Sequence, residues 1–121
     1  MKKLLFFVVL LATPIYSATG VKESATGFVA SAVSISSNSA TAIPATALAG
    51  RFKVIIQNTG TYDVYIGSHS GVTTANGFLV SASTAGYHSK LEFPVPSGKT
   101  IYGLAESHHS GSATIRILEI K

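Results

Sequence analysis

The sequence has no cysteine and no tryptophan, and only 12% of its residues are charged. The missing cysteine excludes disulfide bonds, thiol catalysis and cysteine-ligated metal sites, so stability has to come from packing or from association with neighbouring molecules. Without tryptophan, a stacking platform for sugars is a weaker hypothesis than ordinary packing of the aromatic side chains. The composition therefore indicates a small domain that is held together without covalent cross-links.

Charge of either sign is sparse and does not cluster. Nine Lys and Arg residues stand against five Asp and Glu residues, which gives a formal net charge of +4. Two of the basic residues, Lys2 and Lys3, lie at the very start of the chain. Electrostatic binding to nucleic acid needs a basic stripe, and the sequence contains none. We therefore expect no nucleic-acid partner.

The longest hydrophobic run lies at the N-terminus. A short basic start precedes Leu4–Ala12, Pro14 breaks the run, and small residues follow at Ser17 and Ala18. This layout predicts a secretory signal peptide over residues 1–17, and the alternative is an uncleaved hydrophobic arm. The run is shorter than the roughly 20 residues that span a bilayer. We therefore expect no stable membrane insertion once the segment is removed.

A length of 121 residues allows one domain. Residues 18–28 are rich in Ala, Ser, Thr and Gly and poor in charge, which predicts a flexible linker or arm. Residues 29–121 then make up the folded domain.

Alternation of apolar and polar residues dominates this domain. Phe52, Val54 and Ile56, for example, share one face of an extended chain, while Lys53 and Gln57 lie on the other. Such runs, separated by Gly, Ser, Asn and Pro, predict an all-β fold, a single antiparallel β-sandwich of about seven short strands. The expected strands are Val29–Ser36, Phe52–Gln57, Asp63–Gly67, Gly77–Val80, Lys90–Val95, Thr100–Ala105 and Ala113–Ile120.

A hairpin is the most specific local prediction. Phe52–Gln57 and Asp63–Gly67 flank the sequence Asn58-Thr59-Gly60-Thr61, in which Asn and Gly suit a tight turn. Gly77–Val80 would add a third strand to this hairpin. The predicted core residues are Phe52, Val54, Ile56, Val64, Ile66, Leu91, Phe93, Ile101, Ile115 and Ile117.

The segment Ala40–Gly50 is alanine-rich but contains Pro44, which opposes a helical conformation at the residue before it. We expect a strand end followed by a turn, with one helical turn at Ala45–Leu48.

Histidine is the only residue type that suggests a metal site. Its four copies, His69, His88, His108 and His109, all lie in Ser/Gly-rich context. Neighbouring residues of a strand point to opposite faces, so His108 and His109 cannot hold one ion from a regular strand. A symmetric trimer could bring one histidine from each subunit to its axis, but solvated loop histidines are the simpler interpretation. We expect no metal and no cofactor.

The acidic residues and serines give no catalytic pattern. General acid–base pairs need two carboxylates that converge in a cleft, whereas Glu92, Glu106 and Glu119 are dispersed and predicted to face solvent. No Gly-x-Ser-x-Gly motif is present. We therefore expect no catalytic residues and no enzymatic activity.

Tyrosines offer a candidate contact surface instead. Tyr62, Tyr65, Tyr87 and Tyr102 each combine a large apolar ring with a hydroxyl group, which suits protein contacts. The loops Gly67–Gly71 and Ser107–Gly111 resemble each other, although Ser/Gly-rich turns often do.

Residues 40–121 contain a series of motifs made of strand ends and turns. They are Ile43–Arg51 (IPATALAGR), Val54–Gly60 (VIIQNTG), Val64–Gly67 (VYIG), Val72–Gly77 (VTTANG), Pro96–Ala105 (PSGKTIYGLA) and Arg116–Ile120 (RILEI). In this order they resemble small β-sandwich virion structural proteins of tailed bacteriophages, which serve in capsid decoration, head fibres or tail-associated structures.

The resemblance implies a non-enzymatic structural protein, located in the virion, that acts through contacts with other virion structural proteins. It also implies a homo-oligomer, for which we expect a trimer. A subunit assembled in the cytoplasm does not need export, so the signal-like start favours an alternative. That alternative is a secreted or periplasmic bacterial β-sandwich module that binds surface glycans.

Overall fold

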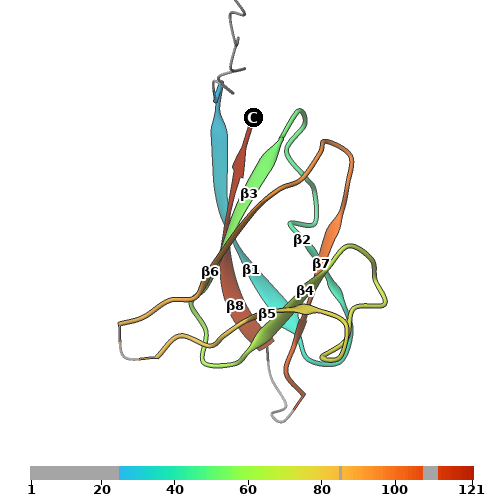
Figure 1. Ribbon diagram of the computed structural model, residues 1–121, viewed down its shortest axis with the longest axis vertical. Helices are drawn as coiled ribbons and strands as arrows, with labels where there is room; N and C mark the ends of the chain where they lie inside the picture. Colours follow the sequence, from blue (N-terminus) through green and yellow to red (C-terminus); the bar gives the residue numbers. More distant parts are fainter. Residues whose placement is uncertain (1–24, 85, 108–111) are drawn as a thin grey trace, which may run out of the picture.

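The computed structural model describes residues 25–84, 86–107 and 112–121 (Figure 1). The predicted signal peptide 1–17 and most of the predicted linker 18–28 lie outside these ranges. The described residues form no helix. Their strands are β1 (Phe28–Ser36), β2 (Thr41–Ile43), β3 (Lys53–Asn58), β4 (Val64–Gly67), β5 (Phe78–Val80), β6 (Lys90–Pro94), β7 (Ile101–Ala105) and β8 (Ser112–Ile120).

The strands form two four-stranded antiparallel sheets, which confirms the predicted β-sandwich. The first sheet has the order β1-β8-β3-β6 and the second the order β2-β7-β4-β5. Figure 1 shows β1 and the C-terminal strand β8 side by side along one layer. Consecutive strands alternate between the sheets except for β4 and β5. This order is that of an eight-stranded jelly roll.

The predicted hairpin between Phe52–Gln57 and Asp63–Gly67 is wrong, because β3 and β4 belong to different sheets. Asn58 is fully buried, and its side-chain amide donates hydrogen bonds to the carbonyl oxygens of Tyr62 (2.8 Å) and Val80 (2.9 Å). Its side-chain oxygen accepts from Gly60 N–H at 2.9 Å. The Asn58–Thr61 segment therefore carries the chain between the sheets, and the third predicted strand, observed as β5, pairs with β4 alone.

One strand was not predicted as a separate element. β2 is only three residues long and follows β1 after a short bend. The expected helical turn at Ala45–Leu48 is not formed. Leu48 N–H instead donates to the Glu119 carboxylate, at 3.1 and 3.2 Å from its two oxygens. A side chain from β8 thus replaces the local hydrogen bonds that a helical turn would have made.

The core lies between the two sheets and agrees with most of the predicted residues. Leu91 and Phe93 pack against it but stay partly exposed. Phe52 is a wrong prediction, since it is only half-buried and lies outside the core, whereas its neighbour Arg51 is 1% exposed. Phe52 precedes β3, where regular alternation has not yet begun. The predicted residues that are buried are Val54, Ile56, Val64, Ile66, Ile101, Ile115 and Ile117.

Candidate functional site

A β-sandwich has sheet edges at which backbone hydrogen-bonding groups are left without a neighbouring strand. Proteins usually shorten such strands or place charges and proline on them, because a long uncharged edge invites pairing with another chain. Here β2 and β5 are edges of only three residues each. The two longer edges, β1 and β6, belong to the same sheet.

The hydrogen bonds of Gly27 fix which backbone groups of β1 point outward. Gly27 N–H donates to Lys121 O at 3.0 Å, and Lys121 N–H donates back to Gly27 O at 2.9 Å. Because hydrogen-bonded residues alternate in an antiparallel ladder, odd-numbered residues of β1 face β8 and even-numbered ones face away. The outward N–H of Ser36 is taken up by Thr41 Oγ1 at 3.1 Å. Among the described residues, no strand pairs with the remaining outward groups, which are those of Phe28, Ala30, Ala32 and Ser34 and are here called the free edge.

The opposite edge, β6, has a different composition. Asn58 N–H donates to Ser89 O at 3.0 Å and Val95 N–H donates to Phe52 O at 2.9 Å, so odd-numbered residues of this strand face β3. The outward positions are therefore Lys90, Glu92 and Pro94. Two of them are charged and the third has no N–H to donate. The β6 edge carries the usual safeguards against strand pairing, and the free edge carries none.

A groove with a mixed apolar and polar lining runs beside the free edge. Its volume is about 450 Å³, and it lies between β1 and the segment that follows β2. The start of β1 is poorly covered there, since Phe28 is 74% and Val29 47% exposed. Its lining residues are Val29, Ser31, Ala32, Val33, Ser34, Thr41, Ala42, Pro44, Ala45, Thr46 and Glu119.

Two of the four predicted contact tyrosines share the outer face of the second sheet. Tyr65 lies between Leu79 of β5 and Leu104 of β7, and Tyr102 lies in the next row. The loop between β4 and β5 packs on this face, because a Cβ at Gly77 would lie 2.6 Å from Tyr65 Cβ. The face is uncharged and half-covered by its own loop.

The other two tyrosines lie elsewhere. Tyr62 packs against the core. Tyr87 is 82% exposed and forms an isolated bridge with Thr84. The four residues therefore do not form one surface.

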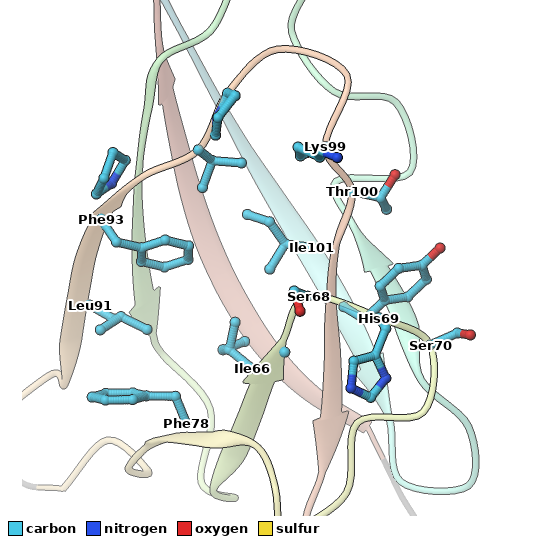
Figure 2. A pocket seen from close by; sticks show the side chains of 15 residues that line it. Ile66, Ser68, His69, Ser70, Phe78, Leu91, Phe93, Lys99, Thr100 and Ile101 are labelled. Atoms are coloured by element: carbon cyan, nitrogen blue, oxygen red, sulfur yellow. The ribbon is translucent and has the colours of Figure 1, made fainter.

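A second, larger pocket opens on the β6 side of the sandwich, with a volume of about 760 Å³ (Figure 2). Its lining residues come from β4, β5, β6, β7 and the segments that follow β4 and β6. Figure 2 shows Phe78, Leu91 and Phe93 along one wall, with Ile66 and Ile101 between the walls. These five side chains make this side of the pocket apolar.

The opposite wall of this pocket is polar. Figure 2 shows Ser68, His69 and Ser70 on that side, with Lys99 and Thr100 towards one end. The ring nitrogen Nδ1 of His69 accepts a hydrogen bond from Gly71 N–H at 3.1 Å, which orients the ring. The pocket therefore offers an apolar face and a face of hydroxyl, imidazole and ammonium groups.

The largest polar group in the interior is an ion pair that the sequence did not indicate. Arg51 Nη1 donates to Glu119 Oε1, Arg51 Nη2 donates to Lys99 O, and Glu119 is 2% exposed. The prediction that Glu119 faces solvent is wrong, because Arg51 from the loop before β3 compensates its charge inside the protein. Within the described chain, Arg51 Nε has no hydrogen-bond partner. The pair ties the loop before β3 to β8 and to the β6–β7 turn.

The described histidines do not come together. His69 lines the β6-side pocket, and the Nδ1 atom of His88 lies 2.7 Å from Ser83 Oγ. His108 and His109 lie outside the described residues, as does most of the loop Ser107–Gly111. Over residues 25–84, 86–107 and 112–121, no group of three or more His, Asp or Glu side chains could hold a metal ion.

The comparisons with known proteins identify no relative. No protein-family model, no curated protein and no solved structure matches this chain. Among the residues that the structure describes, no helix has the length and apolar character needed to cross a membrane. The interpretation of function therefore depends on the free edge, the groove beside it, the β6-side pocket and the sequence pattern.

Proposed function

We propose that this protein is a non-enzymatic structural subunit of a bacteriophage virion that acts through protein–protein contacts. The observation that carries the proposal is the free edge of β1, a strand of nine residues that contains neither a charged residue nor proline. An edge of this kind is a disadvantage in a protein that works alone, and it is useful in one that pairs with a neighbour.

Two further observations support the proposal. The jelly-roll order is one that viral capsid domains use, although lectins and cupins use it as well. The uncharged outer face around Tyr65 and Leu104 could pack on a neighbouring protein in the same assembly. Capsid decoration, a head fibre and a tail-associated position would each use such contacts.

Purification of phage particles from a host that carries the gene tests this function. We expect the protein to remain with the capsid or tail proteins through a density gradient and to be present in a fixed ratio to them by mass spectrometry. Its absence from particles, together with its presence in the culture medium or periplasm, would overturn the proposal. Capsid, portal or tail genes beside its gene would be consistent with it.

The β6-side pocket favours a second candidate function, a secreted module that binds surface glycans. A sugar ring has an apolar C–H face and polar hydroxyl groups, and the pocket opposes Phe78 and Phe93 to Ser68 and Thr100. Titration with oligosaccharides from bacterial surfaces, monitored by calorimetry, would test this candidate. Phe93→Ala should weaken the binding at least tenfold, whereas Tyr87→Ala should leave it unchanged, because Tyr87 is exposed and is not part of the pocket lining.

A further inference from the structure

We propose that the free edge of β1 binds a second copy of this chain, so that two β1 strands pair antiparallel about a two-fold axis at Ser31. The pairing joins the first sheets of both copies into one continuous sheet. This inference rests on the proposed function, because it names the partner that a structural subunit would meet at that edge.

The partner is a second copy because the contact needs only one open edge. In an isologous contact both molecules use the same surface, and β1 supplies it on each. A ring of three copies joined edge to edge would need a second open edge on every molecule. In the described residues the remaining edges are the three-residue strands β2 and β5 and the charged, proline-containing β6. The trimer expected from the sequence would have to form through another surface.

The hydrogen-bonding pattern selects the register. The N–H of Ser36 is already bonded to Thr41 Oγ1, which leaves four residues with outward groups. All four residues of one copy pair with the same set of four in the second copy when Phe28 faces Ser34 of the second copy and Ala30 faces its Ala32. Each of the four residue pairs exchanges two hydrogen bonds, about eight in all. Ser31 then faces its own equivalent across the axis.

The side chains are compatible with this register on both faces. On the outer face, Ala30 and Ala32 are small and bring no like charges together. On the inner face, Val29 lies opposite Val33 of the second copy. Both valines line the 450 Å³ groove beside the free edge, so the two side chains of each copy would meet apolar side chains of the other there. Pairing would therefore cover Val29, which is 47% exposed in the single chain.

Single cysteines test the register directly, because the natural chain has none. With Ser31→Cys in the full chain, the two copies of residue 31 would face each other within the Cα separation that a disulfide tolerates. Mild oxidation should convert most of the protein to a covalent dimer on a non-reducing gel. Ser34→Cys is the matched control, since its two copies would lie roughly 20 Å apart along the paired strands. Equal cross-linking of both variants, or of neither, would overturn the register.

Proline at an outward position tests the edge itself. Ala32→Pro removes an N–H that β8 does not use, and Pro94 already occupies an outward position of β6. Light scattering of the full chain at tens of micromolar should give a dimer mass for the natural protein and for Ala32→Ser, and a monomer mass for Ala32→Pro. Circular dichroism would check that all three are folded. A monomeric or trimeric natural protein would overturn the inference.

These outcomes are separate from those of the virion test. A protein that co-purifies with phage particles but is monomeric and does not cross-link refutes the paired β1 strands and keeps the structural role. A protein that dimerises through residue 31 but never enters particles refutes the structural role and keeps the pairing.

Discussion

The β1 side and the β6 side of this sandwich differ in how far the backbone of the edge strand is protected from pairing with another strand. Both strands are edges of the first sheet. Along β1 the backbone is open, and the groove beside it, of about 450 Å³, has the buried Glu119 in its lining. Along β6 the backbone edge is protected, and the pocket beside it is larger, at about 760 Å³.

The difference separates two kinds of contact. An open backbone edge recognises another extended strand through main-chain hydrogen bonds, with little demand on side chains. A hollow with one apolar and one polar wall recognises the shape and chemistry of a side chain or small ligand. The β1 side is therefore suited to assembly and the β6 side to selective binding, and one domain could use both without competition between them.

The largest expected effect comes from making β6 resemble β1. The triple variant Lys90→Ser, Glu92→Ser and Pro94→Ala removes the safeguards from the second edge. Each copy could then pair at two edges, so we expect open-ended chains in place of a closed dimer. Sedimentation velocity over a range of protein concentrations would measure the growth. Lys53→Gln is the control, because it breaks the ion pair with Glu92 and leaves the outward positions intact. An unchanged sedimentation coefficient in the triple variant would show that composition does not distinguish the edges.

The buried ion pair should give the largest loss of stability from a single substitution. Glu119→Gln leaves the Arg51 charge uncompensated in the interior, and breaking a buried pair in this way costs about 3–5 kcal/mol. The double variant Arg51→Met with Glu119→Leu removes both charges and should be less destabilised than Arg51→Met alone or Glu119→Leu alone. Guanidinium unfolding at one fixed protein concentration would measure the differences. A loss below about 1 kcal/mol for Glu119→Gln would mean that water reaches the pair.

The alternation in the sequence predicted the strands and most of the core, because a period of two defines which residues share a face. It could not predict which strands pair. Asn58-Thr59-Gly60 has the composition of a hairpin turn, and the same composition serves a crossing between sheets. The conformation of this segment is determined by the Asn58 side-chain amide, which donates to Tyr62 O and to Val80 O. Val80 lies 22 residues away in the sequence. Which strands pair depends on the whole fold, so it cannot be predicted from the local strand and turn propensities of the sequence.

The candidate surfaces were partly visible in the sequence. The lack of charge in Phe28–Ser36 and the charges and proline of Lys90–Pro94 can be read directly. That both are edge strands of one sheet becomes known only with the topology. The Arg51–Glu119 pair joins residues 68 apart, and each looks like an ordinary surface charge in its own segment. The pocket brings together residues of β4, β5, β6 and β7, and the sequence does not show that these strands lie near one another.

Ile56 lies on β3, in the middle of the core that separates the two sides, and it provides a reference for stability. Ile56→Ala should cost about 2–5 kcal/mol, the range for a fully buried large-to-small change. Ile55→Ala, on the outer face of the same strand, is half-buried and should cost clearly less. Thermal and guanidinium unfolding of both variants would measure the ratio. Equal costs would mean that another layer covers the outer face, as it would in an assembly.

The smallest expected effect concerns the exposed ion pair on the β6 side. Lys53 Nζ lies 3.1 Å from Glu92 Oε1, and the two side chains are 35% and 42% exposed. Water and salt screen such a pair, so Glu92→Gln should cost about 0–1 kcal/mol, and 1 M NaCl should remove most of that difference. Guanidinium would screen the pair by itself, so urea unfolding with and without salt is the suitable measurement. A loss above about 2 kcal/mol that persists in salt would mean that Glu92 holds β6 in place. The near-neutral outcome would show that Glu92 contributes little to the stability of the fold, so any effect of the β6 triple variant on association could not be explained by loss of this ion pair.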